Sequence, residues 1–154
     1  MTGGQGSATK TLQGSCLCGA IAFEIDGPFP NLYQCHCSLC RKQGGSVSNT
    51  GLIVAADKFR WSRGEPLITT WQRSTGFRSH FCSRCGSPVP NPLRDTGFIW
   101  VPSGLLDDGE TLEIAAQLYL GSRAPWDRAE GSGEEFETAP GLAALIAWLH
   151  PQPE

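Results

Sequence analysis

The stretches that decide this fold are three short cysteine clusters, which read Cys16-Leu17-Cys18, Cys35-His36-Cys37-Ser38-Leu39-Cys40 and Cys82-Ser83-Arg84-Cys85-Gly86. Closely spaced thiols are the ligands that a thiophilic metal ion needs, and zinc is the default expectation. A structural zinc takes four protein ligands, whereas a catalytic zinc takes three and keeps one position open. The seven cysteines of the chain divide naturally into four and three. The clusters therefore predict one structural and one reactive site.

The third cluster has the spacing of a zinc knuckle. Two residues separate Cys82 from Cys85, so one tight turn can direct both sulfur atoms at one ion. Gly86 permits the positive φ that such a turn needs. A second pair of ligands must come from elsewhere, and Cys16 and Cys18 can supply it. We expect such a site to join distant segments and to contribute folding free energy, the alternative being ordinary buried cysteines.

The second cluster places Cys35, Cys37 and Cys40 within six residues. His36 and His80 are candidates for a fourth ligand, although a hydrogen-bonding role is favoured for each. If the fourth position is open, zinc held by three thiolates suits an external thiol better than it suits the generation of hydroxide. A zinc-bound thiolate stays nucleophilic and can add to an aldehyde carbonyl. We therefore expect this cluster to carry the chemistry.

Basic and aromatic residues near the clusters are candidate substrate contacts. Arg41 and Lys42 directly follow the second cluster, and arginine binds carboxylates in a bidentate manner. Trp126 falls in a predicted loop and is a candidate pocket residue, although core packing is favoured for it. Further arginines approach the third cluster, namely Arg73, Arg78 and Arg84. The alternative for each basic residue is a solvated surface position.

The bulk composition narrows the class of protein. A chain of 154 residues with 40% hydrophobic residues suits one domain, and its 19 glycines and 11 prolines favour a β-rich fold. The formal net charge of -3 argues against a nucleic-acid partner. No apolar run approaches the ~20 residues of a membrane span, and no basic-then-apolar leader is visible. We therefore expect a cytoplasmic protein whose cysteines hold metal rather than disulfides.

Periodicity predicts strands followed by one helix. The small polar residues 1–10 predict a flexible tail and leave residues 11–150 as the domain. Alternation and β-propensity predict strands at 20–25, 32–35, 47–54, 67–73, 77–82, 98–101 and 112–120, with a helical turn at 38–42. Apolar residues at i, i+3, i+4 and i+7 predict a short C-terminal helix, namely Leu142, Leu145, Ile146 and Leu149. Four tryptophans lie in apolar patterns and are predicted in the core, namely Trp61, Trp71, Trp100 and Trp148.

Taken together, the ordered clusters resemble the glutathione-dependent formaldehyde-activating enzyme family. The matching segments are Gly14-Ser15-Cys16-Leu17-Cys18-Gly19-Ala20, Cys35-His36-Cys37-Ser38-Leu39-Cys40-Arg41, Phe81-Cys82-Ser83-Arg84-Cys85-Gly86 and the later Ala124-Pro125-Trp126. The resemblance runs from about Leu12 to Pro140. It implies a single, mainly antiparallel β domain with the β-tent fold, stapled by zinc.

The resemblance also implies the ligand sets and the reaction. A structural zinc would be held by Cys16, Cys18, Cys82 and Cys85, and a catalytic zinc by Cys35, Cys37 and Cys40, giving two zinc ions per chain. The implied activity is that of a carbon-sulfur lyase, which joins glutathione and formaldehyde reversibly into S-hydroxymethylglutathione. The partners would be a glutathione-like thiol and a small aldehyde, with no nucleic acid and no membrane.

Two other classes of function stay open at the level of sequence. One is a zinc-stapled binding module without turnover. The other is a thiol redox or metal-buffering protein that uses Cys35, Cys37 and Cys40 as a labile site. Aldehyde turnover distinguishes the enzyme from both.

Overall fold

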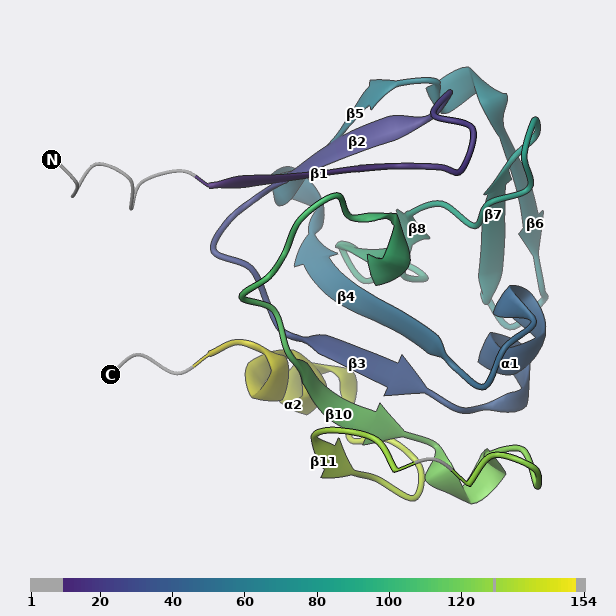
Figure 1. Cartoon of the computed structure of the whole chain (residues 1–154), viewed down its shortest axis with the longest axis vertical. Coiled ribbons are helices and arrows are strands. Elements are labelled where there is room, and N and C mark those ends of the chain that lie inside the picture. Colours follow the sequence, from purple (N-terminus) through teal and green to yellow (C-terminus); the bar gives the residue numbers. More distant parts are fainter. Residues whose placement is uncertain (1–9, 129, 152–154) are drawn as a thin grey trace, which may run out of the picture.

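Strands dominate the computed structural model, which describes residues 10–128 and 130–151 (Figure 1). The strands are β1 (Thr11–Ser15), β2 (Ala22–Asp26), β3 (Leu32–Cys35), β4 (Asn49–Ala55), β5 (Phe59–Arg63), β6 (Ile68–Gln72), β7 (Arg78–Cys82), β8 (Asn91–Pro92), β9 (Phe98–Pro102), β10 (Ile114–Leu118) and β11 (Glu134–Glu135). The α-helices are α1 (Ser38–Gly44) and α2 (Leu142–Leu149), and short 3₁₀ turns lie at Ala56–Lys58, Glu65–Leu67, Ser103–Leu105 and Leu120–Ser122. Nearly all of the predicted tail, residues 1–9, lies outside the described residues.

The strands form three sheets in the described part of the chain. Their orders are β1-β2-β5, β11-β10-β3-β4-β9-β8 and β6-β7. Most neighbours are antiparallel, whereas β10 runs parallel to both β3 and β11. The predicted mainly β fold with one short C-terminal helix is confirmed.

The central strand β4 separates two apolar clusters. Leu52 and Val54 pack with Phe23 and Ile25 of β2 on one face, while Ile53 faces the cluster that contains β10 and α2. Successive side chains of a strand point to opposite faces, so an unbroken apolar run is what a strand covered on both sides requires. The larger sheet is therefore buried on both faces at its centre.

The C-terminal helix covers one face of the larger sheet. Leu145 and Leu149 are buried, and Leu142 and Ile146 pack against the same cluster. The side-chain spacing brings these residues to one side of the helix, as the periodicity predicts. This placement puts α2 over β3 and β10 near the end of the chain (Figure 1).

Two tryptophans depart from the sequence expectation. Trp71 is 54% exposed on the two-stranded β6-β7 sheet, and Trp148 of α2 is 51% exposed. Trp148 donates its indole N–H to the carbonyl of Ala115 at 2.8 Å. Their predicted core positions are wrong because a thin hairpin and a surface helix each leave one side open to solvent. Trp100 is buried, as predicted.

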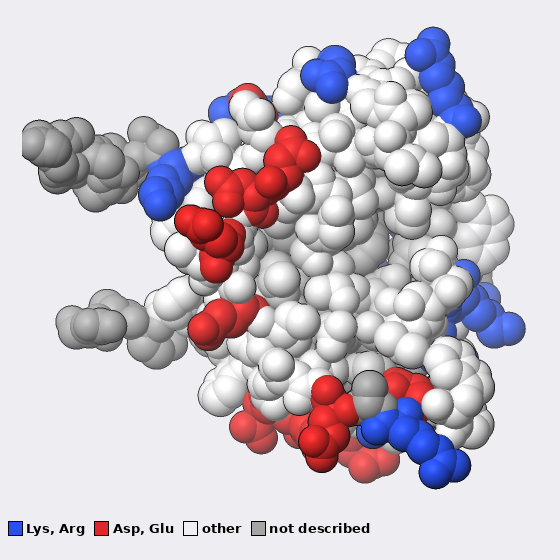
Figure 2. Space-filling model, viewed as in Figure 1, with Lys and Arg blue, Asp and Glu red and all other residues white. Residues whose placement is uncertain are grey.

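The surface charge is uneven on the face shown in Figure 2. Acidic side chains gather in two areas, one of them at the bottom of the view where the exposed β11 (Glu134–Glu135) lies. Basic side chains are more scattered: they lie at the top and right of this view and also beside both acidic areas. In the described residues, no helix is both long enough and apolar enough to cross a membrane.

Candidate metal and substrate site

The first thiol group brings together two segments that lie far apart in the sequence, one directly after β1 and one at the end of β7. The sulfur atoms of Cys16, Cys18, Cys82 and Cys85 all lie within 4.8 Å of one another. The Sγ–Sγ distances are 3.7 Å from Cys16 to Cys18 and 3.9 Å from Cys18 to Cys82. Thiolates at the corners of a zinc tetrahedron stand about 3.8 Å apart, because each Zn–S bond is about 2.3 Å long. The spacing of the four sulfur atoms therefore fits tetrahedral coordination of a zinc ion.

Backbone geometry holds this four-cysteine group in place. Gly86 has a φ of 79°, the left-handed conformation that the sequence predicted for the knuckle turn. Backbone N–H groups of Ile21 and Arg84 donate to the sulfur atoms of Cys16 and Cys82. Hydrogen bonds from the Ser87 side chain and backbone lower the pKa of Cys85 to about 5, which favours the thiolate that a metal ion binds.

The second thiol group lies where a strand passes into a helix. Cys35 ends β3, Cys37 is the N-cap of α1, and Cys40 lies in its first turn, with the three sulfur atoms within 4.8 Å of one another. The Cys37 sulfur accepts a hydrogen bond from the backbone N–H of Cys40. Hydrogen bonds from the Cys35 and Cys40 thiols, together with those from the backbone N–H groups of Cys40 and Leu39, hold the pKa of Cys37 well below 9.0. Three such sulfurs fit three corners of a zinc tetrahedron.

A buried polar network fixes the backbone between these cysteines. His36 donates from Nε2 to Oε1 of Gln117 at 2.7 Å. The amide of Gln117 donates in turn to Oε1 of Gln34 and to the carbonyl of Ser132, each at 2.8 Å. The other ring nitrogen of His36 lies 3.7 Å from Asp127. The ring thus engages β10 rather than the thiols, and among the described residues neither thiol group includes a histidine nitrogen.

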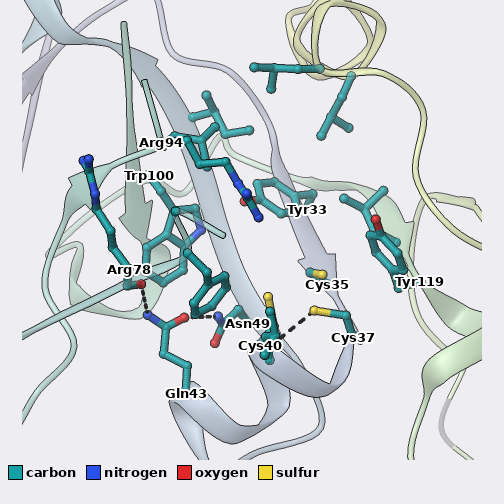
Figure 3. A pocket seen from close by; sticks show the side chains of 18 of the residues that line it. Tyr33, Cys35, Cys37, Cys40, Gln43, Asn49, Arg78, Arg94, Trp100 and Tyr119 are labelled. Carbon is teal, nitrogen blue, oxygen red and sulfur yellow. Dashed lines mark hydrogen bonds between the residues drawn. The ribbon is translucent and has the colours of Figure 1, made fainter. Parts of the chain in front are cut away.

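The three-cysteine group opens into a cavity of about 520 Å³ (Figure 3). Tyr33 and Trp100 form part of its wall, beside Cys35, Cys37 and Cys40. Gly51 of β4 makes room for this arrangement, because a Cβ there would lie 2.3 Å from Nε1 of Trp100. The four-cysteine group does not border this cavity. The two thiol groups therefore have different surroundings, because only the three-cysteine group faces this cavity.

Two arginine residues, Arg78 and Arg94, are among those that line the same cavity. Arg78 comes from β7, where its Nε donates to Gln72 and its Nη2 lies 3.6 Å from Asp95. Arg94 comes from the loop between β8 and β9, has a φ of 51°, and donates to the carbonyl of Thr75. In Figure 3 the Arg94 side chain extends toward Tyr33. The pocket thus combines thiols with positive charge.

The candidate substrate contacts from the sequence lie elsewhere. Arg41 and Lys42 belong to the last turn of α1, and Trp126 is 67% exposed on its loop. None of the three borders the cavity, and their role as substrate contacts stays a prediction. Arg94 was missed, because only the fold brings its loop to the thiols. Arg78 was one of the further arginines weighed from the sequence.

The fold and its thiol groups define a class of β protein with two cysteine groups that could hold thiophilic metal ions, one of them beside a cavity. Within that class, residues 11–122 match the sequence profile described as "Glutathione-dependent formaldehyde-activating enzyme", and the chain belongs to this family.

A named relative and a solved structure are among the proteins similar to this chain. A Halomonas elongata protein named "Putative glutathione-dependent formaldehyde-activating enzyme" is 38% identical over 84 residues. That match covers 51% of this chain and 54% of the relative, so the chain spans about half the length of the curated protein it matches. A solved structure of a Rhodobacter sphaeroides protein has a TM-score of 0.55, with 24% identity, covering 66% of this chain and 96% of that chain. The second likeness concerns the fold.

Proposed function

We propose that this protein catalyses the reversible addition of glutathione to formaldehyde, as a carbon-sulfur lyase. The observation that carries the proposal is that three thiols and two arginine residues line one cavity. Such a cavity offers a soft-ligand position for a thiol and cationic positions for its carboxylates. Family membership supports the same reaction.

Two zinc ions belong to this proposal. Cys16, Cys18, Cys82 and Cys85 would hold one as a structural ion, and Cys35, Cys37 and Cys40 would hold the other beside the cavity. When bound there, zinc supplies a thiophilic fourth position that favours the thiolate form of an incoming thiol. The two sets account for all seven cysteines.

The side chains of the cavity would bind and orient the thiol. We assign carboxylate recognition to Arg78 and Arg94, since a guanidinium forms paired hydrogen bonds with a carboxylate. The surrounding apolar wall excludes water from the reacting atoms, which strengthens electrostatic interactions inside. In the reaction a bond forms between sulfur and the carbonyl carbon, the C=O π bond breaks, and the oxygen takes up the proton that the thiol gave up.

Exchange spectroscopy tests this proposal directly. ¹³C-formaldehyde and glutathione are mixed with zinc-loaded protein, and the exchange rate between free formaldehyde and S-hydroxymethylglutathione is measured by NMR. The expected result is exchange faster than the protein-free background, in proportion to protein concentration. The Cys37→Ser variant serves as the control, because it removes one thiol of the pocket and leaves the four-cysteine group intact.

The opposite outcome is equally informative. Exchange at the background rate, with both zinc ions confirmed by metal analysis, would overturn the enzymatic proposal in favour of a binding or metal-buffering role.

We also propose a cytoplasmic location, because a reducing compartment keeps the seven cysteines free for metal binding.

A further inference from the structure

One part of the cavity wall is more apolar than the proposed substrates require, although polar side chains line other parts of it. Ile53 of β4, Leu118 of β10 and Leu145 of α2 are buried and border the cavity together with the three cysteines. Leu142 of α2 and Leu93 of the loop after β8 complete this apolar wall. These five residues come from four separate parts of the chain. The apolar wall therefore forms only when the chain folds, because no single segment contains all of these residues.

Neither glutathione nor formaldehyde matches this wall. Formaldehyde has two heavy atoms and fills about the space of one or two water molecules, each of ~30 Å³, within a cavity of about 520 Å³. Glutathione carries two carboxylates and an ammonium group, and placing such groups against aliphatic side chains costs free energy. The guanidinium groups of Arg78 and Arg94 suit those charges, whereas the apolar wall leaves room for something else.

We propose that the cavity takes an aldehyde with an aliphatic chain of about six carbons, whose chain lies against the apolar wall while its carbonyl faces the three-cysteine site. The proposal rests on the proposed thiol addition and names a larger aldehyde class for it. The reaction is the same as for formaldehyde: the S–C bond forms at the carbonyl carbon, the C=O π bond breaks, and the carbonyl oxygen takes up the proton of the thiol. Burial of the chain supplies the selectivity, since each buried methylene contributes roughly fourfold in affinity.

The helix α2 has a particular part in this inference. Leu142 and Leu145 lie beyond residue 122, where the match to the family profile ends. In Figure 3 the helix lies over one side of the pocket. The apolar wall therefore depends on a segment outside the matched region, and aldehyde selectivity is the property that such a segment can set without altering the thiol groups.

A binding measurement tests the proposal without any turnover. S-hexylglutathione and S-methylglutathione are unreactive thioethers that resemble adducts of a long and a short aldehyde. Isothermal titration calorimetry on the zinc-loaded protein should give tighter binding for the hexyl compound by at least about tenfold, the effect of burying about two of its additional methylenes. Equal affinities for the two compounds would overturn the proposal.

Two variants of α2 locate the alkyl chain. Leu142→Asn places a polar group in the apolar wall and should reduce the hexyl preference to about threefold or less. Ala147→Asn, on the exposed side of the same helix beside Trp148, should leave the preference intact, because that side borders a separate shallow depression. The reverse pattern would place the chain outside the cavity and overturn the proposal. Leu93→Asn repeats the wall test outside α2, should Leu142→Asn lower the melting temperature strongly.

Turnover then separates the two proposals. If hexanal exchanges with glutathione faster than formaldehyde does, relative to their uncatalysed rates, both proposals gain support. A hexyl preference in binding, without acceleration of either aldehyde, would overturn the lyase proposal and leave the alkyl-binding wall standing. Acceleration with formaldehyde, but no hexyl preference in binding, would overturn the alkyl proposal alone.

Discussion

At the scale of single residues, the two thiol groups differ in what surrounds them. Cys82 is fully buried and packs with Ile21 and Val89, whereas Cys37 is half-buried and borders the cavity. A ligand enclosed by core residues contributes to folding, because its loss disturbs packing and metal binding together. A ligand at the wall of a pocket can be changed with less effect on the fold.

The Cys37→Ser variant should lose activity and keep its fold. We expect NMR exchange of formaldehyde with glutathione to fall to the background rate, because one of the three pocket thiols is gone. The free energy of unfolding should change by only about 1 kcal/mol, since the side chain is half-buried. A variant with undiminished exchange would contradict the assignment of chemistry to this group.

The Cys82→Ser variant should behave in the opposite way. Loss of a buried ligand of the four-cysteine group should lower the free energy of unfolding by about 4 kcal/mol or more. Thermal or urea unfolding of both variants, side by side, measures the difference. Equal losses of stability in Cys37→Ser and Cys82→Ser would show that the two groups do not divide structural and reactive roles.

The Arg94→Gln variant tests carboxylate recognition. Replacing the guanidinium by an uncharged amide should raise the KM for glutathione by about tenfold, the effect of losing a hydrogen bond to a charged group worth ~1.5 kcal/mol. Arg73→Gln is the matched control, because Arg73 is exposed and does not border the cavity. Steady-state exchange kinetics give both values, and similar KM values for the two variants would refute the role of Arg94.

At the scale of elements, local patterns predicted what lies within one segment. The alternating side chains of residues 20–25 anticipated β2, and the apolar spacing of α2 gave both its bounds and its buried face. The edge strands β1 and β5 escaped prediction, because only their pairing with β2 makes them strands. The two thiol groups were predictable, since close spacing along the chain brings their sulfur atoms together. The position of Arg94 was not predictable from the sequence, because its approach to the thiols depends on the path of the β8–β9 connection.

The Gln117→Leu variant tests how β10 supports the three-cysteine segment. Gln117 is 2% exposed and joins His36, Gln34 and the carbonyl of Ser132. Its replacement leaves buried polar groups without their partner, which should cost about 1–3 kcal/mol of unfolding free energy. Exposed Gln72→Leu is the control and should cost less than about 0.5 kcal/mol. Urea unfolding measures both, and an equal, small loss would show that the network is dispensable.

At the scale of the whole molecule, the larger sheet carries the three-cysteine group while the four-cysteine group lies beside the other two sheets. Cys35 belongs to the apolar cluster shared by β3, β10 and α2. Cys16 and Cys82 belong to a separate cluster with Ile21 and Val89. Binding a metal to one group therefore need not alter the packing around the other. Activity and folding should respond separately to loss of metal.

Stepwise removal of metal tests this separation in the intact protein. A site with three protein ligands and an open position should release zinc at a lower chelator concentration than one with four ligands, because the ion has fewer protein bonds and is open to competition. Native mass spectrometry should show two zinc ions falling first to one, and formaldehyde exchange should vanish at that step. Circular dichroism should show unfolding only as the second ion leaves. Unfolding that precedes or accompanies the loss of the first ion would contradict this order, because the reactive group would then be the one on which the fold depends.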